Sequence, residues 1–135
     1  MLQQIPTKKF ELAFWGLRAA IGILFVTVGL TKFGPSFPNY LLDLGLPVEL
    51  QIPIALAECI GGAFLILGFL TRVSAGILAV IMIGAIIIKE MSMPYEIATI
   101  ETDLILLSGC ILILVTGAGK ISISRYINKL PEIMK

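Results

Sequence analysis

Four long apolar segments follow one another along this chain, separated by short polar or proline-containing stretches. A helix needs about 20 mostly apolar residues to cross a bilayer. The segments that approach or meet this length are residues 12–31, 50–70, 73–90 and 98–117. The pattern therefore predicts an all-α fold, an integral membrane four-helix bundle with up-down-up-down order, as a single domain over residues 1–135.

The connections between these segments constrain their arrangement. Only Thr71 and Arg72 separate the second segment from the third, so these two segments are expected to be antiparallel neighbours. The longer connection, 32–49, contains three prolines, which break the interior of a helix. Its central part, NYLLDLGL, predicts about two turns of a short amphipathic helix that lies on the membrane surface between the first two segments.

Composition supports a membrane protein and excludes several other classes. Hydrophobic residues make up 58% of the chain and charged residues 14%, whereas roughly a quarter of a soluble domain is charged. The lipid bilayer is thus the predicted partner, and a net charge of +1 gives no reason to expect nucleic acid binding. The chain has no histidine, and Cys59 and Cys110 lack metal-ligand spacing, so no metal site is predicted.

The basic residues are distributed unevenly about the predicted bundle. The side that carries both termini holds Lys8, Lys9, Arg72, Lys120, Arg125, Lys129 and Lys135. The other side holds Lys32 and Lys89. Because basic residues favour the cytoplasmic side of a membrane, we expect a multi-pass protein of the cell membrane with both termini cytoplasmic.

Several charged residues lie in or beside the apolar segments. Arg18 and Glu58 lie well inside them, where a charge costs about 2.5–3.5 kcal/mol by insertion scales. The remaining members of this predicted intramembrane charge network lie near the outer ends of the segments: Lys32, Lys89, Glu101 and Asp103. At about 1.5 Å per residue, Arg18 and Glu58 are roughly 9 Å apart along the bundle axis. We therefore expect the two side chains to lean toward each other, with a water or a ligand between them.

Helical periodicity places the charges together with small residues. Gly22, Phe25, Gly29 and Lys32 fall within about 40° of Arg18 on one helix face. In the second segment, Glu58 and Gly62 share a face in the same way. Small residues let membrane helices approach closely, so these faces are predicted to be packed inside.

Two interpretations of the buried charges stay open at this point. In one, a buried ion pair only fixes which helices are neighbours, while the outer lysines extend their ammonium groups to the membrane interface. In the other, Glu58 is a candidate for handling protons, because carboxyl groups inside a membrane often mark a functional site.

Four stretches carry a family resemblance: LRAAIGILFVTVGLTKF, LGLP, AECIGGAFLILGFLTR and ETDLILLSGCILILVTGAGKISI. Over about residues 14–124 the chain resembles the DoxX family of small four-helix membrane proteins, which is related to the DoxD subunit of archaeal thiosulfate:quinone oxidoreductase. The matching charged positions are Arg18, Lys32, Glu58 and Glu101. Where many relatives have an aspartate after the serine of the last motif, this chain has Ile123.

The resemblance implies a membrane subunit of a quinone-linked or thiol-linked oxidoreductase complex. It implies that the cofactor is a quinone and that no cofactor is bound covalently. It also implies that the chain assembles with protein partner subunits or as a homo-oligomer. The alternative is a non-catalytic accessory helix bundle that stabilises a larger membrane complex. A small transporter is less favoured, because the sequence contains no visible inverted repeat.

Overall fold

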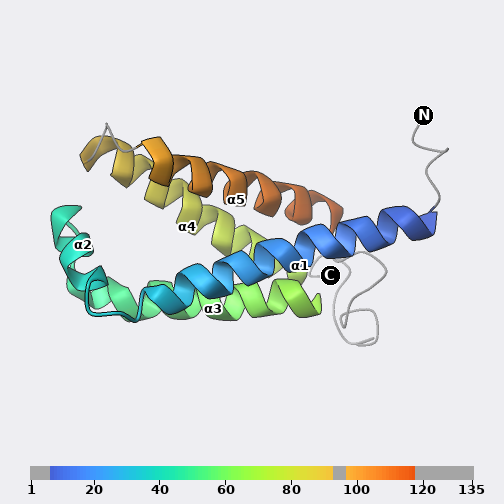
Figure 1. Ribbon diagram of the computed structural model, residues 1–135, viewed down its shortest axis with the longest axis horizontal. Helices are drawn as coiled ribbons and strands as arrows, with labels where there is room; N and C mark the ends of the chain where they lie inside the picture. Colours follow the sequence, from blue (N-terminus) through green and yellow to red (C-terminus); the bar gives the residue numbers. More distant parts are fainter. Residues whose placement is uncertain (1–6, 93–96, 118–135) are drawn as a thin grey trace.

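The computed structural model describes residues 7–92 and 97–117, and over these residues the chain is all-helical, as predicted (Figure 1). In chain order the elements are α1 (Thr7–Thr31), α2 (Phe37–Asp43), the 3-10 helix η2 (Val48–Leu50), α3 (Gln51–Leu67), α4 (Thr71–Ser92) and α5 (Ile97–Thr116). Residues 93–96, between the third and fourth predicted segments, and the end of the last family stretch beyond Gly117 lie outside the described residues.

The predicted apolar segments correspond to α1, α3, α4 and α5. In the part of the chain that the structure describes, three segments are long and apolar enough to cross a membrane, judged by length and composition: Lys8–Thr31, Val48–Leu67 and Thr71–Ser92. The fourth predicted segment corresponds to α5, which carries Glu101 and Asp103, and its crossing stays a prediction.

The long helices form two pairs (Figure 1). α1 packs along α3, and α4 packs along α5, and in each pair the helices run in opposite directions. The two pairs approach each other near the short connection between α3 and α4 and separate at the other end, where α2 lies between them. Buried apolar side chains from both pairs form the core, among them Phe25, Leu65, Leu78 and Leu106.

Two glycines allow α1 and α3 to pack at very short range. A Cβ atom added to Gly22 would lie 2.6 Å from the carbonyl oxygen of Gly62, and one added to Gly62 would lie 2.6 Å from that of Gly22. Two helical turns farther along α1, a Cβ on Gly29 would lie 2.7 Å from Sγ of Cys59. The face that combines charges with glycines is therefore packed inside, as its periodicity predicts.

The turn from α3 to α4 is made by a glycine in the left-handed conformation. Gly68 has φ 71°, and the N–H of Phe69 donates to the carbonyl oxygen of Phe64 at 2.9 Å. The Phe64 and Phe69 rings meet edge to face at 5.1 Å between centroids. Such a helix end satisfies some of the last carbonyl groups of α3 and leaves others available to side chains.

The connection between α1 and α3 differs in detail from its prediction. The helix α2 begins at Phe37, earlier than the predicted segment, because the first turn of a helix tolerates Pro38. The helix α2 also packs against the rest of the protein rather than lying only on the membrane surface, since Leu41 is only 2% exposed. The separation of the two helix pairs leaves room for this short helix to pack between them (Figure 1).

The glycine contact predicts a difference between two alanine variants on α1. Gly22→Ala should destabilise the protein by about 1–3 kcal/mol, because the new methyl group overpacks the contact with α3. Gly16→Ala is the control, since a Cβ at Gly16 meets nothing within 4 Å and alanine favours the helix. Thermal unfolding midpoints in detergent check this, and equal midpoints for the two variants would contradict it.

Candidate functional site

One lysine–carboxylate ion pair connects α1 with α3, and a second connects α4 with α5. Lys32, which directly follows α1, pairs with Glu58 of α3. On the other helix pair, Nζ of Lys89 on α4 lies 2.5 Å from Oδ2 of Asp103 on α5. Glu58 is fully buried and Asp103 is 8% exposed, so both carboxylates are neutralised by a lysine inside the protein.

The direction of side chains along a helix explains the pair between Lys32 and Glu58. Side chains tilt toward the N-terminus of their own helix, and α1 and α3 are antiparallel. Lys32 therefore reaches back toward the middle of the pair, while Glu58 reaches toward the end where α2 lies, so the two groups meet. The Lys32 ammonium also lies 5.5 Å from the ring centroid of Phe37 on α2, a distance that suits a cation–π interaction.

The carboxyl group of Glu58 is only partly satisfied. Its Oε1 atom accepts a hydrogen bond from Lys32. Its Oε2 atom is buried and has no hydrogen-bond partner among the described residues. A buried acceptor without a partner is costly, so a proton or a donor at Oε2 would relieve that cost.

Arg18 does not lean toward Glu58, contrary to the expectation from their depths. Its Nε atom donates to the carbonyl oxygen of Leu65 at 2.8 Å, and the side chain is 1% exposed. The same tilt explains this, because Arg18 points toward the N-terminus of α1 and hence toward the end of α3. There it stabilises a carbonyl group in the last turn of α3, where a cation is favourable.

Arg72 makes a similar contact with the other helix pair. Its Nη2 atom donates to the carbonyl oxygen of Val115, in the last turn of α5, at 3.4 Å. Both arginines thus contact the C-terminal turn of a neighbouring helix, at the end of the molecule away from the two ion pairs.

The six charged residues of the predicted network therefore do not form one cluster in the structure. Lys32, Glu58, Lys89 and Asp103 form the two ion pairs. Arg18 is buried at the opposite end of α3, as described above. Glu101 is exposed on α5 and belongs to neither ion pair.

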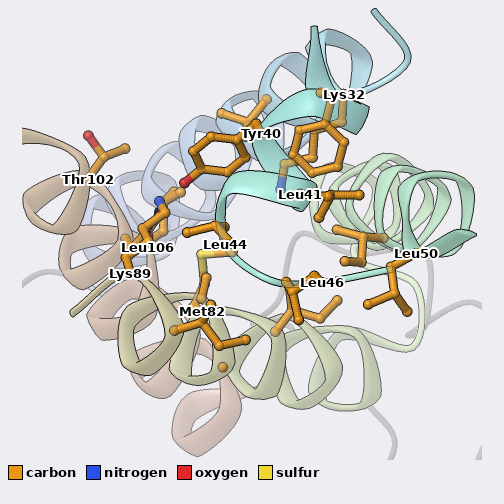
Figure 2. A pocket seen from close by; sticks show the side chains of 18 of the residues that line it. Lys32, Tyr40, Leu41, Leu44, Leu46, Leu50, Met82, Lys89, Thr102 and Leu106 are labelled. Carbon is orange, nitrogen blue, oxygen red and sulfur yellow. Dashed lines mark hydrogen bonds and ion pairs between the residues drawn. The ribbon is translucent and has the colours of Figure 1, made fainter. Parts of the chain in front are cut away.

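A cavity of about 280 Å³ lies beneath α2, between the two helix pairs (Figure 2). Its polar lining consists of Lys32, Tyr40, Lys89, Thr102 and Asp103. The rest of the lining is apolar or glycine and comes from all the elements described above, including Leu41, Leu46, Leu50, Met82 and Leu106. Members of both ion pairs therefore face the same mostly apolar space.

Sequence reasoning missed the contribution of α2 to this cavity. Figure 2 shows Tyr40 with its hydroxyl group directed toward the end of Lys89, and Leu41 on the same short helix. The only local signal for these residues is the apolar run NYLLDLGL inside a proline-containing connection. That run predicts a helix but not the space that the helix covers.

Among the described residues, three helices that are long and apolar enough to cross a membrane indicate a helical membrane protein. The DoxX family model matches residues 13–91, and the chain therefore belongs to the DoxX family, as its motifs predict. One relative is the protein named "Putative oxidoreductase CatD" of Bacillus subtilis (strain 168). It is 32% identical over 124 residues, which cover 90% of this chain and 92% of the relative.

A second relative is the "Uncharacterized membrane protein Rv3486" of Mycobacterium tuberculosis (strain ATCC 25618 / H37Rv). It is 30% identical over 133 residues, which cover 84% of this chain and 80% of the relative. No solved structure matches the chain. The two relatives support the classification of this chain as a membrane protein, and one of them is named "Putative oxidoreductase CatD". The reaction of this chain has to be inferred from the site.

Removing one member of the buried ion pair should cost more than removing both. Lys32→Met leaves the Glu58 carboxylate buried without its cation, so we expect a loss of about 3–5 kcal/mol in stability. The double variant Lys32→Met/Glu58→Met should recover most of that loss, because no charge is then left unpaired.

Thermal unfolding of the double variant and of both single variants, Lys32→Met and Glu58→Met, in detergent measures this coupling. Lys8→Met is the control, because it removes an exposed lysine near the start of α1. A double variant as unstable as the sum of the two single variants would mean that Lys32 and Glu58 are not coupled.

Proposed function

We propose that this DoxX-family protein is the integral membrane subunit of a quinone-linked or thiol-linked oxidoreductase complex, and that the cavity beneath α2 is its quinone site. The observation that carries the proposal is that one mostly apolar cavity of about 280 Å³ is lined by Lys32, Lys89 and Asp103, while Glu58 pairs with Lys32 from outside the lining. The relative named "Putative oxidoreductase CatD" supports the class of reaction.

The side chains around the cavity fit a quinone head group. Such a head group is a flat, mostly apolar ring that carries carbonyl oxygens as hydrogen-bond acceptors. An ammonium group has three N–H donors, so Lys32 and Lys89 keep donors for a ligand after pairing with their carboxylates. The apolar lining would exclude water from the ring, and the hydroxyl group of Tyr40 adds a polar contact on the α2 side.

A bound quinone would supply two-electron redox chemistry that is coupled to the uptake or release of protons. Lys32 would orient the ring by donating from Nζ, while Glu58 keeps that ammonium group charged from behind. Glu58 is the candidate proton carrier, because its buried Oε2 atom can hold a proton without losing any hydrogen bond seen among the described residues. Because the chain has no histidine, we propose that electrons arrive from a partner subunit or from the substrate itself.

A second candidate function is that of an accessory helix bundle that stabilises a larger membrane complex. The observation in its favour is that each ion pair connects the two helices of one pair, α1 with α3 and α4 with α5. Buried ion pairs can serve only to define which helices are neighbours. In that case the cavity would bind no quinone.

We further propose that α1, α3, α4 and α5 all cross the membrane in up-down-up-down order with both termini in the cytoplasm. The paired state of Asp103 supports the crossing of α5, because a neutralised acid is far cheaper to bury in lipid than a lone one. In this orientation Arg18 and Arg72 lie toward the cytoplasm, and the cavity lies toward the outer face.

Cysteine labelling tests this orientation. In a background with Cys59→Ser and Cys110→Ser, Asn39→Cys should react with a membrane-impermeant maleimide in intact cells, because Asn39 is exposed on α2. Lys8→Cys, at the start of α1, should react only after the cells are opened. The reverse pattern would mean that the termini face outward.

Quinone binding tests the proposed site. The purified protein should bind 2-methyl-1,4-naphthoquinone, and Glu58→Gln should weaken this binding about ten-fold, or about 1.4 kcal/mol, because Lys32 then lacks its counter-charge. Glu101→Gln is the matched control, since it neutralises an exposed carboxylate on α5 that belongs to neither of the two ion pairs.

Equilibrium titration measures the affinities, and thermal unfolding verifies that each variant is folded. Unchanged binding in a folded Glu58→Gln variant would remove Glu58 from the site. Absence of binding by the unaltered protein would favour the accessory function.

A further inference from the structure

The cavity also indicates how a ligand is held and by which route it arrives. Resting on the proposed function, we infer that the ligand is an amphiphilic quinone that enters sideways from the membrane. Its ring lies beside Lys32 and Lys89, and its hydrocarbon tail leaves between α3 and α4.

The lining of the cavity is itself amphiphilic. Tyr40 and Lys89 lie together on one side, and Leu46 and Leu50 lie on the other side, next to α3 and α4 (Figure 2). The lining contributed by α3 and by the middle of α4 is apolar or glycine and includes Ile54, Ile81 and Gly84. A ligand with a polar end and an apolar end matches this division.

The cavity reaches the outer surface of the protein on α4. Val80 belongs to the lining and is nevertheless 69% exposed. Gly84 lies one turn farther along α4 on the same face, and a Cβ atom added there would meet nothing within 4 Å. The neighbouring exposed residues Ile83 and Ile87 are apolar. The opening at Val80 and Gly84, which we call the α4 mouth, therefore faces hydrocarbon rather than water.

The connection that precedes α3 covers the cavity on its other side. Leu41 of α2 is buried, and the rings of Phe37 and Tyr40 stack at 5.8 Å between centroids. The side chain of Gln51 on α3 donates to the carbonyl oxygens of Lys32 at 2.9 Å and Gly34 at 3.3 Å. These bonds hold the start of the connection against α3, so α2 stays in place and the α4 mouth is the open route.

The size of the cavity decides which part of the ligand it holds. A cavity of about 150 Å³ accommodates benzene, and sites for whole drug-sized molecules span about 300–1,000 Å³. A volume of about 280 Å³ therefore suits a head group of one or two rings and leaves no room for a long prenyl chain. The chain has to lie outside the α4 mouth, in the membrane.

Photolabelling in lipid nanodiscs tests the position of the tail. The probe is a 1,4-naphthoquinone with a tail of two prenyl units that carries a diazirine near its end. We expect adducts on Ile54, Val80 and their neighbours at the α4 mouth, and we expect excess 2-methyl-1,4-naphthoquinone to suppress them. Adducts concentrated instead on exposed residues of α5, such as Ile105 and Val115, would overturn the inference.

A variant that narrows the mouth gives a second measurement. Gly84→Trp should weaken binding of the prenylated probe at least ten-fold, because the indole ring occupies the opening. Gly16→Trp is the matched control, since it adds the same side chain at an exposed glycine of α1 that also has open space around it. Thermal unfolding verifies that both variants are folded, and equal affinities would overturn the inference.

The outcomes separate this inference from the proposed function. If 2-methyl-1,4-naphthoquinone binds and its binding depends on Glu58, the proposed function stands. Adducts away from the α4 mouth would then overturn only the lateral route. If the naphthoquinone does not bind at all, both the function and the route are overturned.

Discussion

A charged group inside the apolar interior of a membrane protein needs a partner, and this requirement shapes much of the structure. Glu58 is fully buried in α3 and is neutralised by Lys32 at the end of α1. The pair is formed only if the two helices are antiparallel and are placed so that both side chains reach the same point. Lys89 and Asp103 impose the same condition on α4 and α5. Charge neutralisation thus joins the helices within each pair.

The tilt of side chains along antiparallel helices divides the charges between the two ends of the molecule. At one end, Arg18 and Arg72 donate to carbonyl groups in the last turns of α3 and α5. At the other end, the lysines meet carboxylates beside the cavity. The arginine contacts satisfy backbone groups that a helix end leaves open, so they have a sufficient structural explanation. Lys32, Lys89 and Asp103 instead line a space that a ligand can enter, which makes the two ion pairs the better candidates for function.

The helices pack closely within the α1–α3 pair and more loosely between the two helix pairs. At Gly22 and Gly62 the backbones of α1 and α3 lie too close for any added side chain. The two helix pairs, in contrast, separate toward the end that holds α2 (Figure 1). The short helix fills part of this separation, and the remaining space is the cavity that Lys32 and Lys89 face. The α1–α3 pair is therefore tightly packed, while the separation between the two helix pairs provides the candidate site.

The sequence by itself determined the apolar helices, the inward position of the face with Gly22 and Gly62, and the DoxX family, because each depends on patterns along one segment. It also identified the charged residues, but from their depths alone it left both Arg18 and Lys32 as partners for Glu58 and expected Arg18 to lean toward that carboxylate. The tertiary structure decided that Lys32 is the partner of Glu58, because that choice depends on the relative direction and offset of two helices. It likewise decided where α2 packs and that a cavity exists, because both depend on how far the two helix pairs separate, which no local pattern encodes.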